Sequence, residues 1–218
     1  MLMLNLCTDG CRLIGRPDTL MLRVETEAAG RGLGGDVSFL RGSAELSGRA
    51  PLGSLLLGLS LRGGLLVPAA GTSPLCDRFF LGGSSDVRGF ALRGVGPHGP
   101  PPPGSWLDVA GLQADRCNSL GGDAFWAAGA HVWAPLPFAS LRTRLPSLRT
   151  HFFATAGALA ARPSLALVQQ TPAASCGLGL SLDTGSFTIE LNYCKPLVAG
   201  PSDISSPGLH FAVGYNML

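Results

Sequence analysis

Residues 78–90 combine the side chains of this 218-residue chain that are best suited to specific contacts. They read Arg-Phe-Phe-Leu-Gly-Gly-Ser-Ser-Asp-Val-Arg-Gly-Phe, with three phenylalanines and two arginines in a region rich in glycine and proline. A solvated loop has little reason to hold that mixture. We therefore predict a loop that folds back into a cavity, where its rings pack on a wall and its guanidinium groups find polar partners.

Other kinds of site leave little trace in the sequence. No nucleophile motif, phosphate-binding loop or acid pair stands out. His98, His131, His151 and His210 do not cluster in the sequence and lack metal-ligand spacing. We therefore expect no enzyme activity, no metal, no cofactor and no small-molecule substrate.

The composition points toward a membrane rather than toward nucleic acid. Charged residues make up 14% of the chain and its mean hydropathy is +0.31, whereas about 25% charged is usual for soluble domains. No stretch of about 18 residues is apolar and uncharged, so we expect no membrane-spanning helix. The net charge of +2 is too small to indicate a nucleic-acid partner.

Alternation with a period of two residues is the dominant pattern, and it predicts strands. Residues 187–193 are the clearest case, because Thr188, Glu190 and Asn192 alternate there with apolar or aromatic side chains. Roughly eight segments fit the pattern, three of them less regularly. They are 20–27, about 36–48, 54–62, about 122–135, about 149–158, 176–183, 187–193 and 209–217.

Two architectures have such strands. A soluble β-sandwich turns its apolar faces inward, whereas a membrane barrel turns them outward to lipid. The glycine-rich polar faces, the low charge and a strand length of about ten residues favour an all-β antiparallel meander of transmembrane strands. Trp133, Tyr193 and Tyr215 stand near strand ends, where aromatic girdles are expected. The sandwich is the alternative.

The connection of residues 68–121 breaks the regular spacing of the strands. Structureless loops longer than about 12–15 residues are uncommon in compact domains and are usually functional or disordered. We expect the half around residues 79–90 to be structured. The half with Pro97 and the four prolines of residues 100–103 is expected to be a flexible or polyproline insert.

Val87, Arg88, Gly89 and Phe90, preceded by Leu-Gly-Gly with Gly82 and Gly83, carry a resemblance to a known family. They resemble the signature loop of the outer-membrane β-barrel assembly and two-partner-secretion superfamily, the bacterial surface antigen type. Six further runs resemble its mitochondrial branch, the core subunits of the sorting and assembly machinery. These runs are 34–39, 64–68, 120–126, 135–138, 149–153 and 190–194.

The resemblance covers roughly residues 20–218 and implies a sixteen-stranded barrel in the mitochondrial outer membrane. It implies membrane lipids, β-barrel precursor proteins and other subunits of the machinery as partners. Residues 1–218 resemble only the C-terminal half of that barrel, and the family's soluble polypeptide-transport domain has no counterpart in them. A fragment, an incomplete gene model and a shortened paralogue are the alternatives for the chain. A passive outer-membrane channel and a non-functional half-barrel are the alternatives for the function.

The family also implies a role for Arg88, because its signature loop enters the barrel lumen and the arginine contacts the inner wall. The usual partner is acidic, in a Phe-x-Asp-x-Gly strand motif, but Thr155 stands at that position here. A hydroxyl cannot form an ion pair, so Glu190 and Asp123 are the other candidate partners. Gly89 fits the turn because glycine permits a positive φ.

The remaining loop side chains have two expected roles. The rings of Phe79, Phe80 and Phe90 are expected to pack on the lumen wall. Arg78 and Asp86 form either a local brace of the loop or an exposed surface pair.

The last predicted strand resembles the C-terminal targeting strand of mitochondrial barrel precursors. The matching positions are His210, Ala212 in place of the usual glycine, Tyr215 and Met217. In the family this strand also forms one side of a lateral gate, where unpaired edge groups can template an incoming strand.

Overall fold

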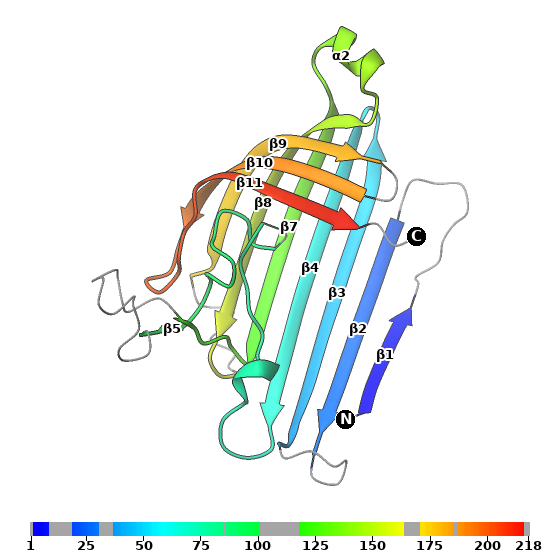
Figure 1. Cartoon of the computed structure of the whole chain (residues 1–218). Helices are drawn as coiled ribbons and strands as arrows, with labels where there is room; N and C mark the ends of the chain where they lie inside the picture. Colours follow the sequence, from blue (N-terminus) through cyan, green and yellow to red (C-terminus); the bar gives the residue numbers. More distant parts are fainter. Residues whose placement is uncertain are drawn as a thin grey trace.

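The computed structural model describes residues 2–8, 19–30, 37–84, 86–100, 118–163, 171–184 and 187–215. Most of them form one antiparallel sheet of nine strands in the order β1-β2-β3-β4-β7-β8-β9-β10-β11 (Figure 1). The strands are β1 Leu2–Thr8, β2 Thr19–Ala29, β3 Phe39–Leu52, β4 Leu55–Pro68, β7 Ala124–Pro135, β8 Leu148–Ala160, β9 Ala173–Asp183, β10 Phe187–Val198 and β11 Gly208–Tyr215.

The expected all-β antiparallel meander is confirmed, and each of the eight predicted strands is present. The short strand β1 is a ninth that the alternation pattern does not predict. The described residues outside the sheet include two short helices, η2 (Leu75–Asp77) and α2 (Ala139–Arg144). Among the described residues, no helix has the length and apolar character needed to cross a membrane.

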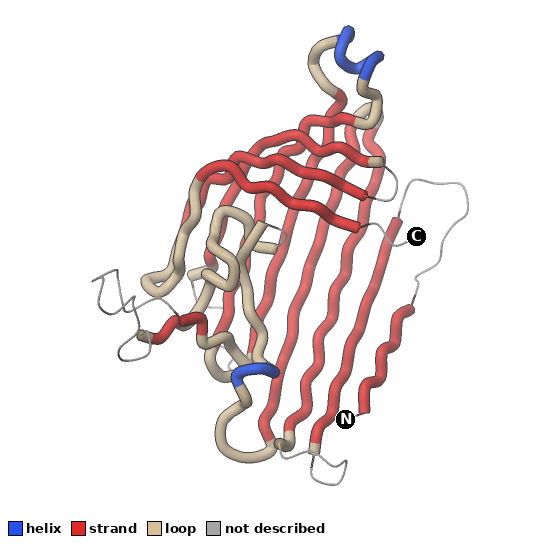
Figure 2. Tube along the Cα trace, viewed as in Figure 1, coloured by secondary structure: helices blue, strands red, loops and turns tan. Residues whose placement is uncertain are grey.

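The sheet is strongly curved and open. Strands β9, β10 and β11 run at a steep angle to β2, β3 and β4, and the connection after β4 lies on the concave side (Figures 1 and 2). Within the described residues, β1 pairs only with β2 and β11 only with β10. Each of these two edge strands therefore has one unpaired edge there.

A row of exposed apolar side chains faces away from the concave side, as in a membrane barrel. On β4, Leu59 and Leu61 are 69% and 54% exposed, while Ser60 between them points inward. On β10, Glu190 and Asn192 are buried while Leu191 is exposed. A soluble sandwich would bury the leucines instead, so the register favours lipid contact for this face.

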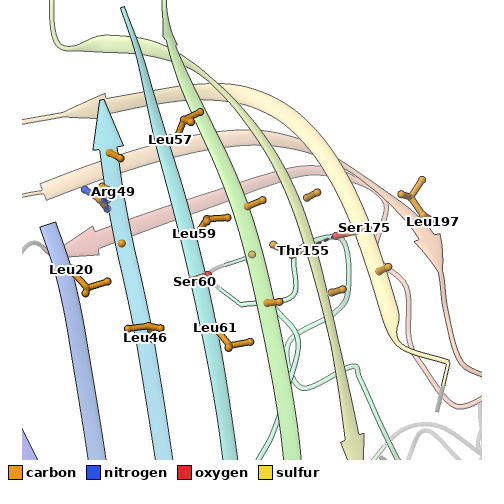
Figure 3. Close-up of a pocket in the computed structure, with 18 residues that line it drawn as sticks. Leu20, Leu46, Arg49, Leu57, Leu59, Ser60, Leu61, Thr155, Ser175 and Leu197 are labelled. Carbon is orange, nitrogen blue, oxygen red and sulfur yellow. Dashed lines mark hydrogen bonds between the residues drawn. The ribbon is translucent and has the colours of Figure 1, made fainter. Parts of the chain in front are cut away.

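This outward face carries a shallow apolar hollow of about 900 Å³ across the middle of the sheet. Figure 3 shows Leu57, Leu59 and Leu61 at the hollow, together with Thr155 and Ser175 on neighbouring strands. The side chains of Thr155 and Ser175 belong to the opposite, concave face, because neighbours along a strand alternate between faces. They hydrogen-bond each other across β8 and β9 at 3.0 Å.

The expectation that Trp133 belongs to an aromatic girdle is wrong, because its side chain faces inward. It shares the inward face of β7 with His131, and its ring stacks on His131 at 5.5 Å and on His151 at 5.1 Å between centroids. Tyr193 faces outward and is exposed, as a lipid-facing aromatic residue would be. The side chain of Tyr215 lies outside the description of the structure.

The long connection between β4 and β7 is more ordered than its sequence suggests. It contains η2 and two short strands, β5 (His98–Gly99) and β6 (Asn118–Ser119), which pair with each other. None of the eight predicted strands falls between residues 68 and 121, so the sequence pattern does not predict this short pair. Most of the expected proline-rich insert, residues 101–103, lies outside the described residues.

Arginine substitutions at two consecutive positions of β3 test which face meets lipid. Leu46 faces outward, whereas Ser47 pairs with Ser60 on the inward face. In lipid vesicles, Leu46→Arg should lower the free energy of unfolding by about 2–4 kcal/mol, because a charge near the bilayer midplane is costly. Ser47→Arg should change it little. Urea titration followed by tryptophan fluorescence measures both, and a larger loss for Ser47→Arg would support the sandwich.

Candidate functional site

The base of the loop is pinned to the start of β7. Phe79 and Gly122 exchange two backbone hydrogen bonds of 2.9 Å each. The Phe79 ring is buried and lies 4.8 Å from the Phe125 ring. A Cβ atom at Gly64 of β4 would stand only 2.7 Å from Phe79 Cζ. The missing side chain of Gly64 therefore makes the space in which this loop ring packs.

Arg78 also holds the base of the loop, but not through Asp86. Its Nε donates to Ser73 Oγ at 2.8 Å and its Nη1 donates to the Leu120 carbonyl at 3.0 Å. The Asp123 carboxylate lies 3.8 Å from Nε and accepts a hydrogen bond from Ser73. Arg78 and Asp86 thus have other partners, so neither alternative expected for them, a local brace or an exposed surface pair, is correct. Asp123 lies at Arg78 rather than at Arg88.

Asp86 instead ties the loop tip to the sheet. Its carboxylate forms an ion pair with Arg62 of β4 and accepts the Gly82 N–H at 3.1 Å. The backbone closes the same turn, since the Val95 N–H donates to the Leu81 carbonyl at 3.0 Å. The described residues between Leu81 and Val95 thus form a compact Ω-type loop whose two ends meet.

Gly82 and Gly83 are required by this closure. Their φ values are 107° and 128°, a region that other residues rarely adopt. A Cβ atom at Gly82 would also lie 2.8 Å from the Ala91 carbonyl oxygen. The two glycines that precede the signature residues therefore allow the chain to fold back on itself.

The Arg88 guanidinium reaches the inner wall of β10. Its Nη2 lies 2.6 Å from Glu190 Oε2, and both side chains are 9% exposed. The guanidinium also lies over the Phe153 ring of β8, 4.9 Å from its centroid. Of the three candidate partners, Glu190 is the one that the structure places against the charge.

The Thr155 side chain contacts the backbone of Arg88 rather than its guanidinium. The Arg88 N–H donates to Thr155 Oγ1 at 3.3 Å, and the Arg88 carbonyl accepts a hydrogen bond from Ser175 Oγ. Thr155 and Ser175 are both buried. Two hydroxyls from β8 and β9 therefore bind the main chain of Arg88 while Glu190 binds its charge.

The other signature residues are buried beside Arg88. Val87 and Phe90 are fully buried, and Gly89 has a φ of 79°. A Cβ atom at Gly89 would meet Ser175 Cβ at 3.2 Å. One at Gly157 of β8 would lie 3.1 Å from Val87 Cγ2. Close approach of loop and wall thus depends on glycine on both sides.

A polar chain behind Glu190 was not found from the sequence. Asn192 Nδ2 donates to Glu190 Oε2 at 3.3 Å, and Asn192 Oδ1 lies 2.9 Å from His151 Nδ1. His151 Nε2 in turn lies 3.0 Å from His131 Nδ1. These residues all occupy inward positions of β7, β8 and β10, a parity that is visible in the sequence. Their proximity, however, depends on strand registers that the sequence does not specify.

The C-terminal strand lies next to this cluster. Ala212 of β11 is in register with Glu190, and His210 with Asn192. His210 Nε2 lies 2.7 Å from the Ser206 carbonyl oxygen. Tyr215 is the last residue of β11, and Met217 lies outside the described residues.

Neutralising Glu190 should lower the free energy of unfolding strongly, because Glu190 pairs with the buried Arg88. Glu190→Gln keeps the shape but leaves the buried Arg88 charge without its counter-ion, which typically costs about 3–5 kcal/mol of unfolding free energy. The matched control is Glu25→Gln, which removes an ion pair with Arg23 whose side chains are 56% and 43% exposed. Its cost should stay below about 1 kcal/mol. Urea unfolding in lipid vesicles measures both, and equal losses would contradict the assigned anchor.

The chain is similar in sequence to known proteins. A family model, the Omp85 superfamily domain, matches residues 17–217. Sorting and assembly machinery component 50 homolog B of Xenopus laevis is 37% identical over 209 residues, and the Homo sapiens homolog is 33% identical over 209. Each match covers 91% of this chain and 41% of the relative, so the chain spans well under half of their length.

Solved structures agree on the fold. BamA from Haemophilus ducreyi lacking POTRA domains 1–3 superposes with a TM-score of 0.68 at 18% identity, covering 96% of this chain and 40% of that one. CdiB from Acinetobacter baumannii gives a TM-score of 0.56 at 17% identity, covering 93% and 31%. The chain belongs to the Omp85 superfamily, and its relatives include sorting and assembly machinery component 50 homologs.

Proposed function

We propose that this chain forms the loop-bearing part of a sorting and assembly machinery subunit that inserts β-barrel precursors into the mitochondrial outer membrane. Omp85-family proteins are insertion and assembly factors rather than enzymes. The observation that carries the proposal is the signature loop bound to the inner wall, with Arg88 paired to Glu190 at 2.6 Å. A simple structural barrel has no need for this buried anchor.

The edge strand β11 supplies the second element of the proposed function. Its ladder with β10 places Ala212 directly beside Glu190, so the arginine anchor lies one strand from the edge. Within the described part of the chain, the other edge of β11 is unpaired. Such an edge can pair with an incoming precursor strand by β-augmentation.

The proposed partners divide between the two faces of the sheet. Membrane lipids contact the leucine-rich outward face, and β-barrel precursors meet β11 at its edge. Other subunits of the machinery complete the complex. His210, Ala212, Tyr215 and Met217 serve in this proposal as the targeting strand that directs the chain itself to the same membrane.

Photo-crosslinking from the edge strand tests the function. A photoreactive residue at Val213, exposed on β11, should capture a labelled β-barrel precursor when the chain is imported into isolated mitochondria. Arg88→Ala should reduce that capture several-fold, because the loop loses its ion pair. Arg93→Ala is the matched control, since the guanidinium of this arginine in the same loop lies over the Phe80 ring, 4.5 Å from its centroid.

Three outcomes would oppose the proposal. Capture that is unchanged in Arg88→Ala would remove the loop from the mechanism. Membrane insertion with ion conductance but no precursor capture would indicate a passive channel. Recovery of the chain only as aggregated, protease-sensitive material would indicate a non-functional half-barrel.

A further inference from the structure

The connection between β10 and β11 pairs with the signature loop. In Figure 1 this orange connection runs beside the green loop, and the backbones of residues 89–94 and 204–206 join there. The Ala91 N–H donates to the Ile204 carbonyl at 3.0 Å, the Ile204 N–H to the Gly94 carbonyl at 2.7 Å, and the Ser206 N–H to the Gly89 carbonyl at 2.8 Å. The loop thus continues from its arginine anchor into a short antiparallel ladder.

Asp203 joins the two segments with one carboxylate. Its Oδ1 accepts the Gly96 N–H of the loop at 2.9 Å, and its Oδ2 accepts the Gly200 N–H of its own turn at 2.6 Å. The Asp203 N–H also donates to the Gly200 carbonyl at 3.1 Å. Hydrogen bonds to an ionised acceptor are stronger than neutral ones. One side chain therefore both closes the turn and holds the loop.

The two segments approach too closely for side chains at the contact. A Cβ atom at Gly94 would lie 2.9 Å from the Ile204 carbonyl oxygen. Gly96 has a φ of 104°, and a Cβ atom there would lie 2.7 Å from Leu159 Cδ2 of β8. Gly94 therefore allows the backbone of the connection to bond the loop directly, and Gly96 allows the loop to pack against β8.

From this arrangement we propose that Asp203 is a positioning residue that latches the signature loop to the last hairpin. The hairpin of β10 and β11 then holds the loop at two points. Glu190 holds Arg88 on the wall, and Asp203 holds Gly96 at the turn. Displacement of the hairpin is transmitted to the loop through the ion pair at Arg88 and through the hydrogen bond at Gly96. The relevance of this coupling to precursor insertion rests on the proposed function, whereas the latch itself does not.

Hydrogen exchange of the whole chain in lipid nanodiscs tests the latch without any precursor. In Asp203→Ala, amide exchange should accelerate roughly tenfold or more at Gly96 and at Ala91, because the bonds that order the loop are lost. Asp203→Asn keeps one acceptor oxygen and should give an intermediate change. It also serves as the variant to compare if Asp203→Ala folds poorly.

Thr184→Ala provides the matched control in the neighbouring hairpin. Thr184 Oγ1 accepts the Phe187 N–H at 3.2 Å in the turn between β9 and β10. Its loss should leave exchange at Gly96 and Ala91 unchanged. If the Asp203 variants accelerate exchange only within residues 200–204, the side chain closes its own turn and the latch is disproved.

A disulfide bond that replaces the Asp203 latch distinguishes positioning of the loop from a general loss of structure. Ala91→Cys and Ile204→Cys, in a chain otherwise free of cysteine and carrying Asp203→Ala, should form a disulfide that restores slow exchange at Gly96. Reduction should abolish the rescue. Failure of the disulfide to restore it would overturn the latch. If exchange is rescued but precursor capture is not, the latch stands and the proposed function is the part that fails.

Discussion

A guanidinium buried against the inner wall of the sheet is the constraint on which the rest of this structure depends. Burying a charge costs several kcal/mol unless it is paired and hydrogen-bonded. Glu190 supplies the pair for Arg88, Asn192 supports Glu190, and hydroxyls of β8 and β9 hold the Arg88 main chain. These groups come from three strands, so all three must keep their register. A slip of one residue in any of them would turn its contributor toward lipid.

The binding of the loop to the inner wall also explains why several inward positions of the strands are glycine. Gly64 leaves room for the rings of Phe79 and Phe125, Gly157 for Leu81 and Val87, and Gly177 for Phe153 beneath the guanidinium. In a strand, glycine normally weakens the sheet and marks a close approach. Here the loop and its supporting aromatic rings occupy the vacated space. The inner wall is therefore shaped for this loop, while the outward face presents leucine and alanine to lipid.

The strands can be predicted from the sequence, whereas the contacts between distant segments cannot, and both facts have physical reasons. Alternation is a local signal, so the eight main strands and the faces of β4 and β10 are predictable from it. The signature residues identify Arg88, yet the sequence leaves three candidate partners open until the registers of β8 and β10 are known. The ladder to residues 204–206 joins segments more than 100 positions apart and leaves no local pattern. The error over Arg78 and Asp86 has the converse cause, since closeness along a folded-back loop does not imply contact in space.

The central claim is that the ion pair between Arg88 and Glu190 seats the loop on the wall, and a charge exchange tests it most directly. The measurement is amide hydrogen exchange across residues 86–96 in Arg88→Glu, in Glu190→Arg and in the doubly substituted chain, all in lipid nanodiscs. Each single change places two like charges in the buried site, so exchange should accelerate by roughly tenfold or more. The double substitution restores opposite charges and should recover most of the protection. Wild-type protection in the single variants, or a doubly substituted chain no better protected than either of them, would contradict the account.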